Sequence, residues 1–343
     1  MHHSPAVIIT RLRHLLQRLR TEAYRPLAPL HLEAWLTPEP VPFDHRSDGR
    51  SQRLELGRSW GRLWDCAWVR VSGRVPEDEI GQDLVLRLDL NGEALVCDGT
   101  GRPVCGLTNT ASIFHRPLGE PGKTVVALAD LGCGPEIEAW LDVGANDLFG
   151  TLQDQGAVRL ADLCRRDRAM IALGYDLEVL VSLYEALPAD RARSKRLLQI
   201  MTETERLLTR LDPATIATAR QWLAPMLARR GGDPSLTVSA LGHAHLDLAW
   251  LWPIRETRRK NVRTFATVLN HMPRHPDYLF GCSQAQLFAW LEEDQPDLFA
   301  AVRDRIADGR IEPLGCMWVE PDINLPSGES LIRQIAQTAT FVH

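Results

Sequence analysis

The sequence lacks any apolar run that approaches the roughly twenty residues needed by a membrane-spanning helix. It also lacks the order of a signal peptide, because a short apolar run near the N-terminus comes before the basic residues. Blocks of basic residues are missing, and the net charge of −5 arises from interspersed arginines and acids. We therefore expect neither a membrane nor a nucleic acid among the partners of this protein.

Cysteines are few and form no Cys-x-x-Cys motif; the seven that are present are an odd number and widely scattered. This distribution argues against a disulfide framework and is typical of reduced thiols, which predicts a cytoplasmic location. The remaining composition is ordinary for a globular protein, with 343 residues, 45% hydrophobic and 24% charged. Such a chain is long enough for two or three domains with their own cores.

Two regions have the periodicity of helices. In residues 1–51, an amphipathic helix is predicted from about Pro5 to Leu36 with a proline-rich extended arm, because apolar residues recur every three or four positions, at Leu12, Leu15, Leu16 and Leu19. Its apolar stripe is short, which favours a helix docked on the protein over one lying on a membrane. Residues 151–234 predict a helical linker region that ends at the Arg229–Pro234 segment.

Residues 52–150 change to a period of two, which predicts short strands. Asn91-Gly92 predicts a hairpin, and Asp98-Gly99 marks another tight turn. Strands at this spacing favour an antiparallel β-sandwich. The region is rich in tryptophan, and a buried core is favoured over a sugar-binding platform for Trp60, Trp64, Trp68 and Trp140.

Residues 235–343 alternate strands and helices, the pattern of a parallel sheet or barrel. Strands are expected at Leu236–Gly242, Tyr278–Cys282 and Ile311–Met317. Helices are expected from about Ile254 to Met272 and from Ala285 to Asp308, the second with a break near Pro296.

Polar residues follow each of these strands: His245 and Asp247, then Ser283 and Gln284, then Asp322. Parallel strands place such residues on one rim. An imidazole with two carboxylates and no cysteine nearby suits zinc or a similar divalent cation. In the alternative, His245 caps a helix and Asp247 pairs with Arg255.

Trp250 follows the His-x-Asp pair closely enough to lie over the rim, where its ring would pack on the apolar face of a sugar. Packing of Trp250 and Trp252 at the start of a helix is equally compatible with the sequence. Four cations, Arg255, Arg258, Arg259 and Lys260, come next. A solvated helix face is favoured for them over a site for a phosphorylated substrate.

Three segments resemble glycoside hydrolase family 38, the retaining α-mannosidases, and within it the cytosolic and bacterial branch. They are Gly242–Pro253 (GHAHLDLAWLWP), Cys282–Gln286 (CSQAQ) and Met317–Ser330 (MWVEPDINLPSGES). The sandwich region, with Trp68–Val71 and Asn91–Asp98, resembles the accessory N-terminal domain of that branch more loosely. The resemblance implies that residues 235–343 begin a (β/α)7-type catalytic barrel.

The resemblance also implies roles for residues. His245 and Asp247 match zinc ligands, Trp250 matches the aromatic that stacks on mannose, and Trp318 is a further candidate for substrate binding. Asp322 matches the catalytic nucleophile, which is also a zinc ligand in this family. The implied cofactor is Zn²⁺ or another divalent cation, and the implied substrate is an α-mannoside oligosaccharide.

In the family, later segments supply a further histidine ligand and the acid/base aspartate, and His343 does not match that histidine. We therefore expect a multidomain α+β and α/β protein: a β-sandwich, a helical linker, and the first βα units of a truncated barrel. Its partner would be the missing C-terminal part, with a homo-oligomer as an open alternative. The 343-residue chain alone should bind zinc weakly at best and show no appreciable turnover.

Two rival functions stay open at this point. One is a non-catalytic carbohydrate-binding or assembly protein that lacks the acid/base residue. The weaker rival is a metal-dependent deacetylase or amidohydrolase, although that chemistry does not call for the residues of the segment Trp318–Ser330.

Overall fold

The computed structural model describes residues 4–108, 122–146, 155–229 and 237–342. The chain forms two compact units. The helical unit comprises Met1–Leu27, Gly81–Asp83 and Cys164–Val238, and the sheet unit comprises Ala28–Ile80, Leu84–Leu163 and Ser239–His343. Among the helices in the described ranges, none has the length and apolar character required to cross a membrane. Of the predicted boundary at Arg229–Pro234, only Arg229 is among the described residues. The terminal His343 lies outside them.

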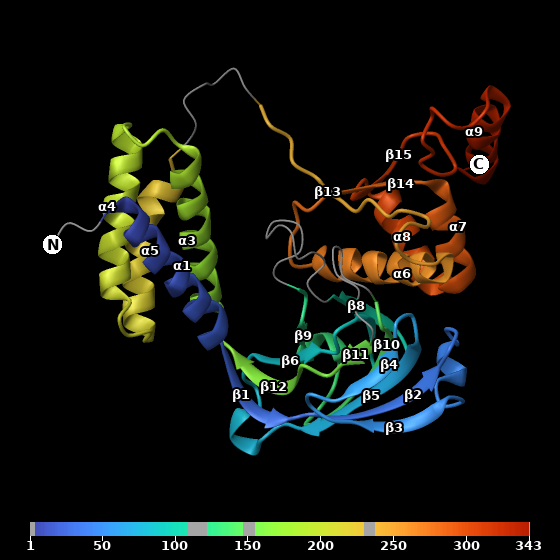
Figure 1. Cartoon of the computed structure of the whole chain (residues 1–343), viewed down its shortest axis with the longest axis horizontal. Helices are drawn as coiled ribbons and strands as arrows, with labels where there is room; N and C mark the ends of the chain where they lie inside the picture. Colours follow the sequence, from blue (N-terminus) through green and yellow to red (C-terminus); the bar gives the residue numbers. More distant parts are fainter. Residues whose placement is uncertain (1–3, 109–121, 147–154, 230–236, 343) are drawn as a thin grey trace. The chain divides into compact units, whose positions relative to one another are not determined.

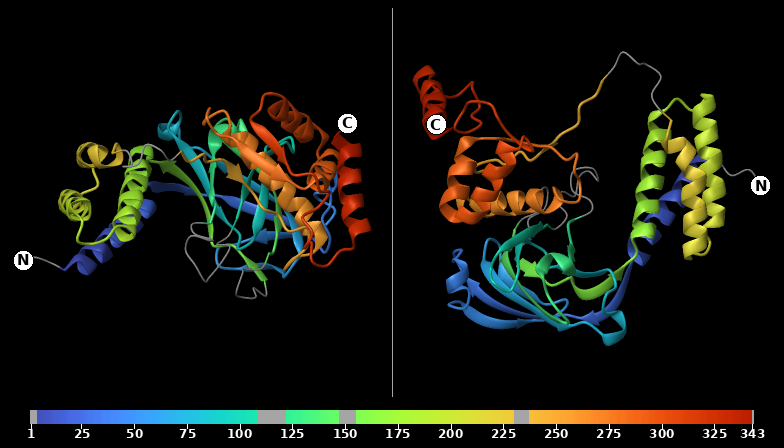
Figure 2. Two further views of the ribbon diagram at one scale, coloured as in Figure 1. Left: turned by 90° about the horizontal axis from the view of Figure 1, so that it is seen from above. Right: turned by 180° about the vertical axis from the view of Figure 1, so that it is seen from behind.

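The helical unit is a bundle of four helices that pack against one another (Figure 1). They are α1 (Pro5–Glu22), α3 (Arg168–Ala186), α4 (Ala192–Leu207) and α5 (Pro213–Leu227). The views of Figure 2 also show these helices side by side. The Asp167 side chain caps α3, and Asp212 forms a capping box with Thr215 at the start of α5. The helices of the predicted helical region thus share one core with α1, and buried leucines from α1 and from that region form it.

The helix predicted from Pro5 to Leu36 is wrong beyond Glu22. The chain there forms β1 (Tyr24–Pro29) and β2 (His31–Thr37) instead. Pro26 and Pro29 have no amide hydrogen and clash with the preceding helical turn, so a helix cannot continue through them at low cost.

The predicted antiparallel β region is confirmed by a six-stranded sheet of order β3-β2-β5-β10-β7-β8. Its other strands are β3 (Arg50–Leu54), β5 (Cys66–Arg74), β10 (Glu136–Gly144), β7 (Glu93–Cys97) and β8 (Pro103–Leu107). A second sheet has the order β1-β12-β6-β9, with β12 (Leu160–Arg166), β6 (Leu84–Asp89) and β9 (Val125–Ala127). The short strands β4 (Ser59–Arg62) and β11 (Gln155–Ala157) pair with each other.

The sheets therefore also include strands that come before residue 52 or after residue 150 in the sequence. Short 3₁₀ helices, η1 (Phe43–His45), η2 (Glu77–Glu79) and η3 (Leu128–Leu131), lie between strands. Trp60, Trp68 and Trp140 are buried, which confirms the core interpretation for these three rings. The indole nitrogen of Trp60 donates to the Leu90 carbonyl, as expected of a buried tryptophan.

Asn91-Gly92 does not form the predicted hairpin, because β6 and β7 belong to different sheets. The pair carries the chain from one sheet into the other, with Asn91 at φ +52°. A Cβ atom on Gly92 would lie 2.2 Å from the carbonyl oxygen of Gly144, so only glycine allows this close approach. The second predicted turn does form a hairpin, β7–β8, in which Gly101 has a φ of +90°.

The C-terminal region forms the parallel sheet that the sequence predicts, of order β13-β14-β15. Its elements are β13 (Gly242–His243), α6 (Ile254–His271), β14 (Phe280–Ser283), α7 (Ala285–Asp294), α8 (Pro296–Ala307), β15 (Ile311–Leu314) and α9 (Gly328–Val342). The break near Pro296 is confirmed. The first strand is much shorter than Leu236–Gly242, because exposed residues such as Val238 have no neighbouring strand. Within the described ranges these strands close no barrel.

Gly92→Ala is expected to lower the free energy of unfolding by about 1–3 kcal/mol, because the new methyl group would meet the Gly144 carbonyl, and β10 cannot move away there without disturbing its pairing with β7. Urea unfolding measures the effect. Gly134→Ala is the matched control, since a Cβ there meets no atom within 4 Å. Equal stabilities for the two variants would show that the close approach at Gly92 is not a constraint.

Candidate active site

The site is built from three loops that follow the parallel strands. Gly242 pairs with Phe280, and Phe280 pairs with Ile311, so the three strands end at the same edge of the sheet. The loop after β13 carries His245 and Asp247, the loop after β15 carries Asp322, and β14 is followed at once by Gln284. This arrangement is the one predicted for parallel strands.

His245 lies between two carboxylates. Its Nε2 is 3.2 Å from Oδ1 of Asp247, and its Nδ1 is 2.7 Å from Oε2 of Glu320. A neutral imidazole has a single N–H, so it satisfies one carboxylate and turns a lone pair toward the other. A cation or a second proton between the remaining nitrogen and oxygen relieves that repulsion.

Gln284 links the first and third loops. Its Nε2 donates to the Leu246 carbonyl at 2.8 Å, and its Oε1 accepts from the Glu320 amide at 3.3 Å. The residue is 4% exposed and has a φ of +69°, a conformation that costs a residue with a Cβ about 1 kcal/mol or more. The buried amide therefore fixes the His245 loop against the Glu320 loop.

The two candidate tryptophans have different surroundings. Trp250 is 54% exposed and contacts Trp252, whose indole N–H donates to the Thr257 hydroxyl at the start of α6. Trp318 is half-buried, donates to Oε1 of Gln286 at 2.9 Å and packs edge-on against Phe341. Both rings are held at the strand ends, and their contact with a sugar stays a prediction.

Asp322 lies exposed in a tight turn of the third loop. Its Oδ1 accepts hydrogen bonds from the backbone and side-chain nitrogens of Asn324, both at 3.0 Å. Among the described residues, no group of three imidazoles, thiols or carboxylates has the arrangement of a metal site. The donors of His245 and Asp247 fit a divalent cation by their type and spacing. The role of Asp322 as third ligand stays a prediction.

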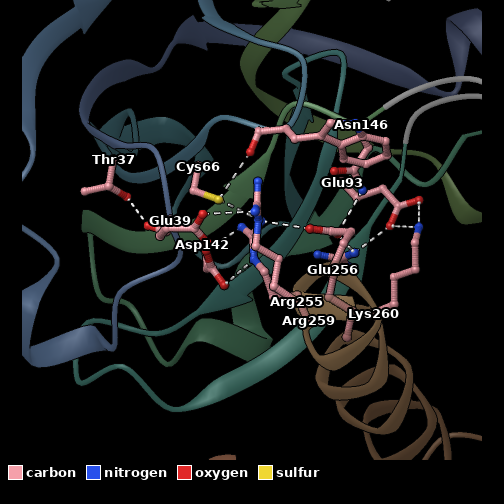
Figure 3. A network of polar contacts seen from close by, with 12 residues as sticks. Thr37, Glu39, Cys66, Glu93, Asp142, Asn146, Arg255, Glu256, Arg259 and Lys260 are labelled. Atoms are coloured by element: carbon pink, nitrogen blue, oxygen red, sulfur yellow. Dashed lines mark hydrogen bonds and ion pairs between the residues drawn. The ribbon is translucent and has the colours of Figure 1, made fainter. Parts of the chain in front are cut away.

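The alternative pairing of Asp247 with Arg255 does not occur, because Arg255 pairs with Glu39 at 3.0 Å. The interpretation of the following cations as a solvated face is wrong for Arg259 and Lys260. Figure 3 shows these side chains in a network of charges between α6 and the sandwich. Arg259 donates to Asp142 of β10, and Lys260 donates to Glu93 of β7 at 2.6 Å.

Glu256 is at the centre of this network and is 3% exposed. It accepts from Arg259 at 2.9 Å, from Arg263, and from Nδ2 of Asn146 at 2.9 Å. Burial alone would raise the pKa of Glu256, but Arg263 and Arg259 outweigh it and lower the pKa to about 2. The carboxylate is therefore held ionised inside the protein.

Cys66 lies beside this network and contacts Arg259. Burial raises the pKa of the Cys66 thiol to about 11, although Arg259 opposes the shift. The signal in the sequence was the spacing of Glu256, Arg259 and Arg263 at three and seven positions, which places them on one face of a helix. Their opposite partners lie more than a hundred residues away, so the spacing alone could not reveal burial.

Comparison with known families agrees with this geometry. Residues 235–343 match the N-terminal domain of glycosyl hydrolases family 38, and residues 28–169 match the jelly roll domain of α-mannosidase. The chain thus resembles the α-mannosidases of glycoside hydrolase family 38 in these two regions. The chain is 32% identical to human α-mannosidase 2C1 over 90% of its own length and 30% of that protein.

Two further relatives are also named as α-mannosidases. An α-mannosidase of Saccharomyces cerevisiae is 29% identical over 90% of this chain and 30% of the relative. α-Mannosidase G of Dictyostelium discoideum is 27% identical over 84% of this chain and 27% of the relative. The chain thus spans about a third or less of the length of the relatives it matches.

Glu256→Gln is expected to lower the free energy of unfolding at pH 7 by about 3 kcal/mol, because two buried arginines lose their shared counter-charge. A carboxylate with a lowered pKa contributes stability above its ordinary pKa of 4.5, and this is lost as the pH falls toward about 2. The variant should therefore show a smaller loss of stability over that interval.

Urea unfolding at a series of pH values measures both effects. Glu136→Gln is the control, since this exposed residue of β10 forms only a long surface pair with Arg74. A Glu256 variant as stable as this control would show that the network does not hold α6 to the sandwich.

Proposed function

We propose that this chain carries the nucleophile side of a retaining α-mannosidase active site, which removes terminal α-linked mannose. The proposal rests on one observation. Nε2 of His245 lies 3.2 Å from Oδ1 of Asp247, and both residues follow the strand ends of a region that matches family 38. The names of the relatives support the substrate class.

Asp322 is the proposed nucleophile. Its carboxylate would form a bond to the anomeric carbon while the bond to the leaving oxygen breaks and that oxygen receives a proton from an acid. Water then attacks the glycosyl-aspartate, releases mannose with its configuration retained and regenerates the carboxylate. The turn formed with Asn324 supports this role by fixing one carboxylate oxygen.

A second carboxyl group, about 5 Å from the nucleophile, is needed as acid and base. Glu320 contacts the His245 ring, and Glu329 pairs with Arg333 at 2.7 Å. Neither Glu320 nor Glu329 matches the position of the acid/base residue in the family that the chain resembles. We infer that the acid/base group comes from residues outside this chain, as do the remaining ligands of the cation.

His245, Asp247 and Asp322 are the proposed ligands of Zn²⁺ or another divalent cation. When bound, the cation would hold hydroxyl groups of the sugar ring. The exposed face of Trp250 would pack against the apolar C–H side of that ring. The cytoplasmic location is supported by seven free thiols, most of them buried.

The rival carbohydrate-binding function makes a distinct prediction for the full-length polypeptide, namely mannose binding without hydrolysis. The deacetylase rival is not supported by any further observation. Hydrolysis of 4-nitrophenyl α-D-mannoside, with the anomer first formed identified by NMR, separates the first two functions.

Asp322→Ala in the full-length polypeptide is expected to lower kcat at least a thousandfold, about 4 kcal/mol of barrier, because the covalent intermediate can no longer form. Asp277→Ala removes an exposed carboxylate before β14 and should leave kcat unchanged. An Asp322 variant within tenfold of the parent would show that the nucleophile is another residue.

A further inference from the structure

We propose that Thr257, in the first turn of α6, is a positioning residue that fixes the segment bearing Trp250 for contact with the mannose ring. The inference rests on the proposed function and deepens it, because Trp250 is the proposed platform for the sugar. Trp250 lies in the middle of Leu248–Trp252, an irregular segment between β13 and α6. Such a segment has no repeating backbone hydrogen bonds, so contacts with neighbouring elements decide where its side chains point.

The Thr257 hydroxyl is bonded to both ends of this segment. It donates to the Leu248 carbonyl at 2.6 Å, with the Asp247 carbonyl further away at 3.3 Å. It accepts from the indole nitrogen of Trp252 at 3.0 Å. A hydroxyl has one hydrogen and two lone pairs, so it can make the donated and the accepted bond together. Thr257 is 0% exposed, and water therefore does not compete for these bonds.

Trp252 passes this constraint on to Trp250. The two rings meet edge to face, with centroids 5.8 Å apart and planes at 89°, an arrangement that aromatic rings favour. The Lys260 ammonium lies 4.6 Å from the centroid of the Trp252 ring, and it is itself held by Glu93 of β7 at 2.6 Å. Trp252 is thus fixed at its nitrogen and over its ring. Trp250 rests against it with 54% of its own surface exposed for a ligand.

Loss of the hydroxyl should displace the exposed ring. Valine has nearly the shape of threonine, but it leaves the Leu248 carbonyl and the Trp252 N–H without their partner in a buried place. These groups can find new partners only if the segment moves, and Trp250 moves with it. A ring that packs on the sugar in the ground state and in the transition state contributes equally to both, so its displacement raises KM and changes kcat little.

The test measures kcat and KM of the full-length polypeptide with 4-nitrophenyl α-D-mannoside. Thr257→Val should raise KM about tenfold and keep kcat within about threefold of the parent. Thr257→Ser keeps the hydroxyl and should return KM to within about twofold of the parent. Thr264→Val is the matched control on α6, because the Thr264 hydroxyl donates to the Lys260 carbonyl of the same helix, and its KM should stay unchanged.

Two changes in the aromatic pair show whether the effect passes through it. Trp250→Ala should raise KM by a similar factor, and adding Thr257→Val to it should change KM little further, because both act on one contact. Trp252→Phe keeps a ring but removes the N–H, and it should raise KM about threefold or more. This variant tests the same link if Thr257→Val does not fold.

The outcomes separate this inference from the proposed function. If the full-length polypeptide does not hydrolyse the mannoside, or Trp250→Ala leaves KM unchanged, the proposed site is wrong and the inference is overturned with it. If Trp250→Ala raises KM while Thr257→Val and Trp252→Phe keep the KM of the parent, the platform stands and the inference about Thr257 is wrong. Equal losses in Thr257→Val and Thr257→Ser, or additive effects of Thr257→Val and Trp250→Ala, would also overturn it.

Discussion

The buried charge network between α6 and the sandwich is the interaction on which the candidate site depends. Three cations, Arg259, Lys260 and Arg263, meet three carboxylates, Asp142, Glu256 and Glu93, so the desolvated charges balance. Removing such charges from water is expensive, and the balance is what makes their burial tolerable. Because α6 follows directly after the loop of His245 and Asp247, its attachment to the sandwich also places that loop.

An apolar core reinforces the same attachment. Trp68 and Trp140 of the sandwich pack in one cluster with Phe265 of α6 and Phe280 of β14. The short parallel sheet is therefore supported by the sandwich within the same compact unit, although it closes no barrel within the described residues. Strands that are supported in this way can hold the polar loops at their ends in fixed positions. Gln284, which follows β14, hydrogen-bonds to the loop of His245 and to the loop of Glu320.

Much of the fold followed from local patterns. Three predicted features are present in the structure: the break at Pro296, the strand–helix alternation after β13, and the β7–β8 hairpin. Each depends on residues that are near one another in the chain. The hairpin predicted at Asn91-Gly92 was wrong, because the same backbone conformation occurs both in hairpins and in connections between two sheets. Which one forms depends on the strands with which β6 and β7 pair, and most of these lie far away in the sequence.

The sequence by itself determined the candidate residues of the site: a His-x-Asp pair, an aromatic and a later aspartate, each after an apolar strand. Their types and spacing are properties of short segments, which a single chain displays directly. Only the tertiary structure decided that His245 lies between Asp247 and Glu320, and that Arg259 finds Asp142 across 117 positions. Those contacts arise from packing between distant segments, and periodicity contains no information about which distant charges are buried together.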